Sequence, residues 1–386
     1  MKKIVAVIFG GKSAEHDVSI ITAHIPIIQS LEASGQFDVW PVYIAKDGSW
    51  YADKRMNDLV LFKNPDLDTR LARMKKIHLL FEGGLHLVWS GLFSRSLRVD
   101  VVFPAMHGTY GEDGSLMGLL RMAGVPFVGC DMSASAIAMD KATTKQVACA
   151  EGIAVVPYVW FTGYDWKVDK EHWIRSITGL TWPVFVKPVH LGSSIGITKV
   201  KERGALEQAI EVALHYDDKV LVEESVENLI EITLPMMGND EVRFGVLERP
   251  LNKTDFFDFN DKYLSGGKNG SGVNAQYSEI PAKIDEELAG RVRAIGKKIY
   301  RVLGCAGMAR MDFLIDSASR KIYINEVNTL PGSLYHHNWR SAGVSNVELV
   351  THLITLAEER FRVQQYITHT FSSDILKKSS GAKTNE

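Results

Sequence analysis

Residues 308–332, MARMDFLIDSASRKIYINEVNTLPG, constrain the fold most, because polar and apolar residues alternate through two consecutive segments. Alternation with a period of two is typical of β-strands that bury one face. The pattern predicts that Arg310 and Asp312 share one face, and that Glu326 and Asn328 share a face of the next strand. Carboxylate and amide oxygens are ligands that Mg²⁺ prefers, so the strands predict a magnesium site suited to phosphoryl transfer. A hairpin with merely solvated polar residues is the simpler alternative.

Composition favours a multidomain enzyme. The chain has 386 residues and is 46% hydrophobic, which suffices for the cores of two or three domains. A net charge of −2 argues against a dedicated nucleic-acid-binding protein, which needs a basic surface. Cys130, Cys149 and Cys305 lack metal-ligand spacing and are expected to be reduced thiols. The N-terminal apolar run is too short for a signal peptide, and no segment approaches the roughly 18 apolar residues of a membrane span. We therefore expect a cytoplasmic protein that contacts neither nucleic acid nor membrane.

Strand-like and helix-like segments alternate in the first third of the chain, which is typical of α/β folds. The predicted strands are Lys3–Phe9, Val39–Ile44 and Val101–Pro104, and the predicted helices are Glu15–Leu31 and Ser115–Ala123. They indicate an open sheet with ligand-binding loops at the strand ends. Residues 45–98 are expected to hold a small hairpin insertion.

The pattern changes near Ser133 to an α+β arrangement. The expected strands are Val155–Phe161, Val184–Lys187, Gly196–Val200 and Val220–Glu223, and the later helices are Asp285–Leu303 and Val347–Val363. These features predict a multidomain protein of mixed α/β and α+β class. The expected domains are 1–132, 133–235 and 236–371, followed by a polar tail, 372–386, that is expected to be disordered.

Two segments of the middle region have the composition of a nucleotide site. In VFVKPVHLGSSIG, residues 184–196, small residues after Lys187 let backbone N–H groups approach an anion. An ordinary turn between strands is the alternative. Glu223 and Glu224 come at a strand end, where carboxylates can accept hydrogen bonds from an adenine amino group or ribose hydroxyls. Unpaired surface glutamates are the alternative there.

Three further loops carry polar groups that a turn does not need. His107, Glu112 and an adjacent aspartate lie between glycines in HGTYGEDG, and Glu15 stands at a helix start, where it is either a ligand or a capping residue. A long glycine-rich loop surrounds Lys262 and Tyr263, and we expect it to be a lid that closes over ligand and excludes water.

Together these segments resemble the D-alanine–D-alanine ligases of the ATP-grasp superfamily. The resemblance runs in order from Ile4 to Gly332 and is carried by VAVIFGGKSAEHDVS, FPAMHGTYGEDGSLMGLL, SASAIAMDKATTK, FVKPVHLGSSIG, VLVEE, DKY, ARMDFL and INEVNTLPG. It implies an ATP-grasp fold behind an N-terminal parallel-sheet domain, with ATP between two antiparallel sheets. It also implies D-alanine as substrate, a role in peptidoglycan precursor synthesis, and a homodimer formed through the N-terminal domain.

The resemblance assigns a role to each matching residue. The nucleotide phosphates would be met by Lys141 and Lys187, and the adenine or ribose by Glu223 and Glu231. Ser194, Glu224 and Lys262 would also contact the nucleotide. Two magnesium ions, which Mn²⁺ could replace, would be held by Asp312, Glu326 and Asn328. Glu15 would hold the ammonium group of the first D-alanine, in a pocket lined by His107, Ser193 and Tyr263. Arg310 and the N–H of Gly332 would meet the tetrahedral oxyanion.

Two other classes of protein remain as alternatives. An ATP-grasp ligase with different substrates should lack GGKSAEHDVS and HGTYGEDG, and both are present. A catalytically silent nucleotide-binding homologue should have lost a metal ligand or a phosphate lysine, and none is missing.

The chain departs from the family pattern after NTLPG, where it continues with SLYHHNW, residues 333–339. His337 falls where the family has a serine that helps to hold the carboxylate of the second D-alanine. Our hypothesis is that D-alanine is still accepted, with its carboxylate bound by Ser333 or by a histidine, while Tyr335 and Trp339 pack as core. A different second substrate, such as D-serine or D-lactate, is the alternative.

Overall fold

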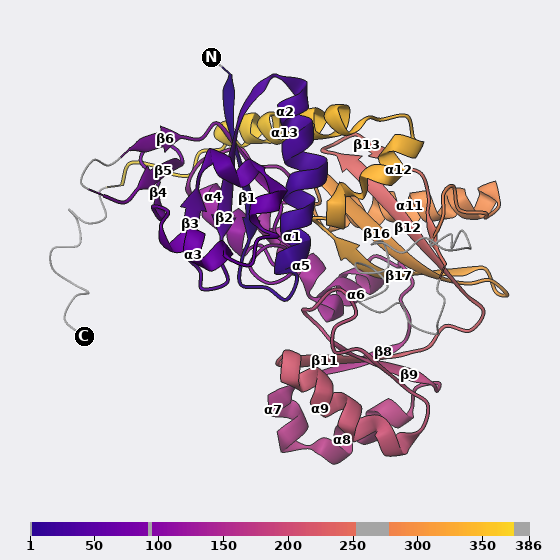
Figure 1. Cartoon of the computed structure of the whole chain (residues 1–386). Helices are drawn as coiled ribbons and strands as arrows, with labels where there is room; N and C mark the ends of the chain where they lie inside the picture. Colours follow the sequence, from indigo (N-terminus) through magenta and orange to yellow (C-terminus); the bar gives the residue numbers. More distant parts are fainter. Residues whose placement is uncertain (1, 92–94, 252–277, 374–386) are drawn as a thin grey trace, which may run out of the picture.

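The computed structural model describes residues 2–91, 95–251 and 278–373. They form an N-terminal α/β part, a C-terminal part built on an antiparallel sheet, and a smaller lobe at the bottom of the view (Figure 1). The expected tail lies almost wholly outside the described residues. In these ranges no helix has both the length and the apolar character of a membrane span.

The N-terminal sheet has the order β3-β2-β1-β7. Strand β1 (Lys3–Gly10) pairs in parallel with β2 (Phe37–Ile44) and β7 (Val101–Pro104), while β3 (Trp50–Ala52) is antiparallel to β2. The predicted open sheet is therefore confirmed. The middle of β1 is fully buried because the sheet is covered on both faces, which explains its uninterrupted apolar sequence.

The predicted helix Glu15–Leu31 is a longer helical run made of three pieces. These are α1 (His16–Thr22), the π-helical η1 (Ala23–Ile28) and α2 (Gln29–Ser34). Pro26 lies inside η1, and a proline removes one backbone donor, which accounts for the irregular turn there. The run ends at Ser34, three residues later than the sequence predicted, and Gly35 caps it in the left-handed conformation.

Residues 45–98 contain the predicted insertion in a more elaborate form. It is a three-stranded antiparallel sheet with the order β4-β5-β6, preceded by short helices. Its elements are η2 (Lys54–Asn57), η3 (Leu59–Leu61), α3 (Leu67–Ala72), β4 (Ile77–Leu80), β5 (His86–Trp89) and β6 (Ser96–Arg98). Helix α4 (Ser115–Met122) follows β7 as predicted.

The smaller lobe is an antiparallel sheet with the order β10-β9-β11-β8. Its strands are β8 (Tyr158–Thr162), β9 (Val184–Pro188), β10 (Thr198–Val200) and β11 (Lys219–Glu224). One face packs on helices and holds the lobe's core; these helices are α7 (Gly163–Val168), α8 (Lys170–Thr178), η4 (Arg203–Ala205) and α9 (Leu206–Tyr216). The four predicted strands are confirmed, although β10 begins later because residues before it form a turn.

The C-terminal sheet is also antiparallel and has the order β13-β12-β16-β17. Its strands are β12 (Leu229–Gly238), β13 (Val242–Phe244), β16 (Gly307–Asp316) and β17 (Lys321–Asn328), and a small ladder joins β14 (Arg249–Pro250) to β15 (Ser278–Glu279). Helix α11 (Glu286–Val302) packs on one face, together with α5 (Met132–Met139). Helix α6 (Lys141–Ala150) contacts β17.

The last helices lead the chain back to its beginning. After η5 (Gly332–Tyr335) and α12 (His336–Ser341), helix α13 (Asn346–Gln365) packs beside α2 (Figure 1). Its buried residues Leu349, Val350 and Leu353 share one hydrophobic core with Val5 and Phe103 of the N-terminal sheet. The C-terminal helix thus covers the N-terminal domain.

Candidate active site

Four polar side chains lie on one face of the paired strands β16 and β17. Arg310 and Asp312 alternate with buried residues along β16, and they stand opposite Asn328 and Glu326 in the register. The predicted shared face is therefore confirmed. A bulge makes this arrangement, because Asp312 pairs with Glu326 while the next residue pairs with Ile324, so that Asn325 is extra. Without it, strict alternation from Ile324 would turn Glu326 into the core.

Charges within this cluster are closely coupled. The Arg310 guanidinium donates to Asp312 from Nε at 2.9 Å and from Nη2 at 2.6 Å, and its Nη2 lies 3.9 Å from Glu326 Oε1. Asn328 Nδ2 donates to Asp312 Oδ2 at 3.0 Å. Burial alone would lower the pKa of Arg310, but the carboxylate of Asp312 outweighs burial and raises that pKa well above its ordinary value. The donor set of two carboxylates and an amide fits a hard divalent cation.

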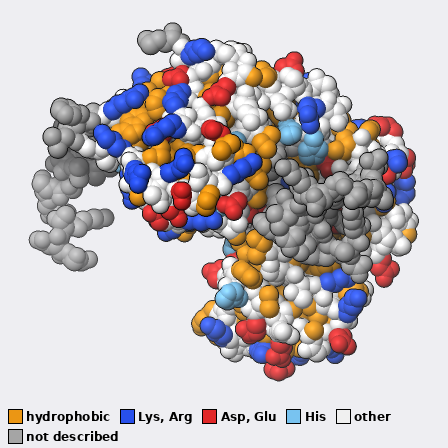
Figure 2. Space-filling view, in the orientation of Figure 1, with side chains coloured by type: hydrophobic (Ala, Val, Ile, Leu, Met, Phe, Trp, Pro, Cys, Tyr) orange, Lys and Arg blue, Asp and Glu red, His pale blue; other side chains and the backbone are white. Residues whose placement is uncertain are grey.

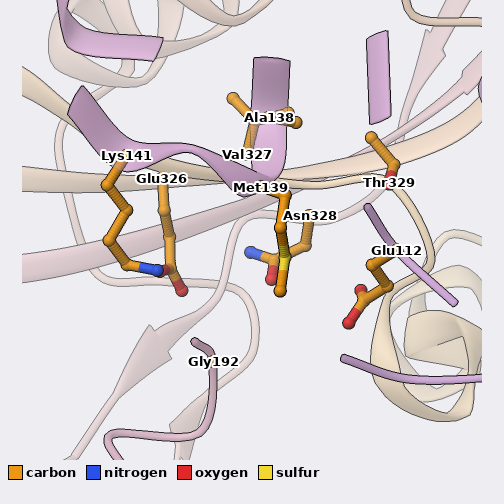
Figure 3. Close-up of a pocket in the computed structure, with 9 residues that line it drawn as sticks. All are labelled: Glu112, Ala138, Met139, Lys141, Gly192, Glu326, Val327, Asn328 and Thr329. Carbon is orange, nitrogen blue, oxygen red and sulfur yellow. The ribbon is translucent and has the colours of Figure 1, made fainter. Parts of the chain in front are cut away.

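A pocket opens beside this cluster (Figure 3). Lys141 and Glu326 lie side by side, with Lys141 Nζ 3.6 Å from Glu326 Oε2, and Glu112 lies across the pocket from them. Lys141 Nζ also donates to the carbonyl of Leu191 at 2.7 Å, which ties it to the glycine-rich loop after β9. The full lining is Glu112, Ala138, Met139, Lys141, Gly192, Glu326, Val327, Asn328 and Thr329.

A buried ionic triad joins α6 to the sheet of the smaller lobe. The carboxylate of Glu223, 1% exposed, accepts from Lys187 and lies 2.7 Å from Lys145 Nζ. Burial raises the pKa of Glu223, but the two lysines outweigh it and lower that pKa to about 2. Sequence reasoning did not assign Lys145 to the site, although its position one helical turn after Lys141 places both on one face of α6.

Glu15 precedes α1 and meets the glycine-rich loop from the other lobe. Its side chain is 7% exposed and accepts a hydrogen bond from Ser193 Oγ. A Cβ on Gly108 would lie 2.9 Å from Glu15 Oε2, and one on Gly192 would lie 3.4 Å from it, so the carboxylate is enclosed by backbone. Burial and the charge of Glu15 raise the pKa of Glu112 to about 8, although the Gly108 N–H donates to Glu112 at 2.7 Å. Three segments remote in sequence thus form one carboxylate-lined end of the site.

Comparison with known proteins gives this constellation a family. Residues 4–130 match the model described as D-ala D-ala ligase N-terminus, and residues 147–355 match that of the D-ala D-ala ligase C-terminus. The chain belongs to the D-alanine–D-alanine ligase family.

Relatives of the family resemble the chain over nearly its whole length. The D-alanine–D-alanine ligase of Thermosipho melanesiensis is 36% identical and aligns with 97% of this chain and 98% of its own. That of Chlorobium phaeovibrioides is 37% identical, with 93% and 98% covered. Among solved structures, the D-alanine-D-alanine ligase of Coxiella burnetii has a TM-score of 0.77 at 28% identity, covering 94% of this chain and 96% of its own. The VanG D-Ala:D-Ser ligase of Enterococcus faecalis has a TM-score of 0.76 at 32% identity, covering 92% and 100%.

Other residues that the family resemblance points to lie at varying distances from the pocket. Ser194 has a left-handed backbone beside Ser193, and Glu231 lies on the open face of β12, opposite Leu314. Glu224 accepts from the Thr181 N–H at 2.8 Å, at the edge of the smaller lobe. Lys262 and Tyr263, with the predicted lid, lie outside the described residues.

His107 is buried behind the cluster instead of facing open space. Its Nε2 is 2.8 Å from Thr22 Oγ1, and the side chain is 4% exposed. Burial, assisted by the positive charge of Arg310, lowers the pKa of His107 to about 4, so the ring is neutral at physiological pH.

The segment after Gly332 differs in part from the expectation. Trp339 is core, as predicted, with 1% exposed. The expectation that Tyr335 is also core is wrong, because Tyr335 is half-buried and the Arg310 guanidinium lies 4.8 Å from the centre of its ring. His337 Nε2 lies 3.1 Å from Glu248 Oε2, and Glu248 is 6% exposed.

His190 was not singled out by the sequence, yet it joins two carboxylates, Asp140 and Asp217. Its Nδ1 is 2.9 Å from Asp217 Oδ1 and its Nε2 is 3.4 Å from Asp140 Oδ2. Hydrogen bonds to Asp140 and then to Asp217 raise the pKa of His190 to about 9. Asp140 caps α6 immediately before Lys141. The imidazolium of His190 therefore links Asp140, at the start of α6, to Asp217, which precedes β11.

We expect His190→Gln to destabilise the protein in a pH-dependent way. Since the folded pKa of about 9 exceeds the ordinary 6.5, the stabilisation is complete below pH 6.5 and disappears as pH rises through 9. Thermal unfolding should separate variant and wild type at pH 6 and bring them together near pH 10. The exposed His215→Gln is the control, and an equal separation at both pH values would contradict a charged His190.

Proposed function

We propose that the chain is an ATP-dependent, ADP-forming ligase that joins two D-alanines into D-alanyl-D-alanine for peptidoglycan precursors. The observation that carries this proposal is that three chemical groups lie in one site. They are the oxygen cluster of Asp312 and Glu326, the ammonium group of Lys141 beside it, and the enclosed carboxylate of Glu15. Phosphoryl transfer needs the first two, and an amino acid's ammonium group needs the third. Curated relatives that carry this name over nearly the whole chain support the substrate.

The ligand roles extend the same proposal. Lys141, Lys187, Ser194 and Lys262 are proposed for the phosphates, and Glu223, Glu224 and Glu231 for the adenine or ribose. The ion pairs of Glu223 add a second role, because they orient Lys187 on the side of the sheet that faces α6. Glu15, Ser193, His107 and Tyr263 are proposed for the first D-alanine.

The chemistry follows from the weakness of a free carboxylate as an electrophile. The carboxylate of the first D-alanine attacks the γ-phosphorus of ATP, ADP departs, and an acyl phosphate forms. The free amine of the second D-alanine then attacks the acyl carbon, and inorganic phosphate leaves as the peptide bond forms. Arg310 and the Gly332 N–H are proposed to meet the oxyanion of the tetrahedral intermediate. Exclusion of water protects the acyl phosphate from hydrolysis.

A divalent cation fits the oxygen donors of this face. Asp312, Glu326 and Asn328 would hold the cation. Asp312 would then give up part of its hydrogen bonding with Arg310 in order to bind the ion. When bound, Mg²⁺ offsets charge on the phosphates and fixes the in-line geometry. We propose two ions, with Mn²⁺ as a substitute.

The direct test is product identification by mass after incubation with ATP, Mg²⁺ and D-alanine. ADP and D-alanyl-D-alanine in equal amounts are expected. ADP release with no dipeptide would remove the proposed function and leave an ATPase or a ligase of another substrate. Absence of ADP would favour the catalytically silent homologue.

The second substrate is the least constrained part of this proposal, because His337 pairs with Glu248 where the family carries a serine. The resemblance to a D-Ala:D-Ser ligase makes D-serine the second candidate acceptor, with D-lactate next. Competition among the three acceptors, read by product mass, decides between them. If the chain couples D-alanine only to another acceptor, the proposal of an ATP-dependent ligase stands. The proposal that its product is D-alanyl-D-alanine is then wrong.

We expect His337→Ala to raise the KM of the acceptor about tenfold, as the loss of one charge-assisted hydrogen bond to its carboxylate. His336→Ala is the matched control, since burial lowers the pKa of His336 to about 4 and leaves it neutral. A KM for the acceptor that is unchanged in His337→Ala would remove His337 from the acceptor site.

The oligomeric state and the domain divisions of the chain are further parts of the proposal. Figure 2 shows hydrophobic side chains among basic ones over the N-terminal part, where Ile21, Ile25 and Val60 are among the exposed large hydrophobic residues. We propose a homodimer through this part, which sedimentation can test, in the cytoplasm, where ATP is supplied. Domains 1–132, 133–235 and 236–371 are proposed as the functional divisions.

A further inference from the structure

The turn directly after Gly332 has an unusual backbone. Ser333, Leu334 and Tyr335 have φ values of 49°, 53° and 50°, so three successive residues other than glycine are left-handed. Such a conformation is strained in residues that carry a Cβ. It persists only where surrounding contacts hold it, and such segments concentrate at functional sites.

Each residue of this turn is held by a different contact. Leu334 is 1% exposed and lies in the core shared with the N-terminal sheet. Tyr335 stacks against the guanidinium of Arg310. The N–H of Ser333 donates to Thr22 Oγ1 at 3.0 Å. Thr22 is therefore a polar anchor of the turn, and it comes from the far end of the chain.

The hydroxyl of Thr22 bonds two partners. It accepts from the Ser333 N–H at 3.0 Å and lies 2.8 Å from Nε2 of His107. The backbone of Leu330 also hydrogen-bonds the ring of His107, and burial keeps the ring neutral. A series of hydrogen bonds thus runs from Leu330 through His107 and Thr22 to Ser333. Its two ends lie on either side of Gly332.

Thr22 also connects the two substrate ends of the proposed site. It is the last residue of α1, which begins directly after Glu15, and it is 1% exposed. Its partner Ser333 follows Gly332, and the turn delivers Tyr335 to the face of Arg310. A displacement of Ser333 would therefore move the Gly332 N–H and the support of Arg310 together.

We propose that Thr22 is a positioning residue of the ligation reaction, whose hydroxyl fixes the left-handed turn Ser333–Tyr335 and thereby the relative position of Gly332 and Arg310. This inference rests on the proposed function of these two groups as oxyanion donors. Thr22 does not line the pocket, so its effect on the reaction passes through the groups that it hydrogen-bonds, the turn at Ser333 and the ring of His107.

The test compares Thr22→Val, which keeps the shape and removes the hydroxyl, with Thr22→Ser, which keeps the hydroxyl. We expect Thr22→Val to lower kcat by about tenfold to a hundredfold, as for a misplaced oxyanion donor, with the KM of ATP unchanged. Thr22→Ser should restore kcat to within about threefold of wild type. Thr351→Val, which removes a hydroxyl that bonds the Val347 carbonyl on α13, should leave kcat unchanged.

A second readout does not depend on activity. Amide hydrogen exchange of a peptide covering residues 330–336 should be faster in Thr22→Val and normal in Thr22→Ser. Wild-type kcat in Thr22→Val, an equal loss in both variants, or a loss that follows only the folded fraction would each overturn the proposal. If the wild type forms no ADP with D-alanine, the proposed function fails instead, and exchange alone decides whether Thr22 holds the turn.

Discussion

Glu326→Gln is expected to lower kcat by at least about a hundredfold at saturating Mg²⁺ and ATP. The substitution keeps the size of the side chain and removes its charge, between Lys141 at 3.6 Å and Arg310 at 3.9 Å. A proposed metal ligand then becomes neutral at the position where charge on the transferring phosphoryl group must be offset.

Folding should survive this change, because Glu326 is only half-buried and lies on the open face of the sheet. Steady-state kinetics with an ADP-coupled assay measures the effect, and thermal unfolding checks the fold. Asp316→Asn, at the solvent end of β16, is the matched control and should stay within about twofold of wild type. Turnover at the wild-type rate in Glu326→Gln would exclude Glu326 from the metal site.

Glu223→Gln is expected to cost about 3–5 kcal/mol of unfolding free energy, the range for a buried charge that loses its partner. Lys145, 1% exposed, would keep its ammonium group without the carboxylate that now lies 2.7 Å from it. Chemical denaturation measures the loss, and Glu224→Gln one residue later should cost less than about 1 kcal/mol. A loss that small in Glu223→Gln would mean that the triad contributes nothing.

The pH dependence of this effect has a definite sign. Because the folded pKa of Glu223 is about 2, below the ordinary 4.5, its contribution is complete above pH 4.5 and is lost as pH falls toward 2. The gap between variant and wild type should therefore be constant from pH 5 to 7 and narrow in acid. Adding Lys145→Met to Glu223→Gln should recover part of the stability, since one unpaired buried charge is removed.

The sequence predicted those parts of the molecule that local periodicity determines. Alternation along β16 placed Arg310 and Asp312 on one face, and the same rule placed Glu326 with Asn328. It did not reveal the bulge at Asn325, because an extra residue in one strand is defined only by its partner strand. The shared face was right because both pairs lie on one side of the bulge.

Partners from distant segments were not readable. Lys145 and Glu223 are separated by most of the smaller lobe, and nothing local marks them as a pair. His190 becomes informative only when Asp140 and Asp217 are seen beside it. The left-handed turn at Ser333 contradicts local preference, since residues without a glycine's freedom adopt it only under tertiary constraint. The sequence therefore predicted which residues form the candidate site. Contacts between distant segments determine the ion pairs of the site and the strained backbone of the turn at Ser333.

The packing of α13 on the N-terminal sheet has a consequence for how the protein forms on the ribosome. The chain leaves the ribosome from its N-terminus, so β1 and α2 emerge long before Leu349 and Leu353, the residues that cover them. During that interval a hydrophobic face of the nascent first domain is exposed to solvent. The same face would stay exposed in a fragment that ends at residue 132. Emergence of α13, and not completion of the first sheet, is then the step that covers the N-terminal core.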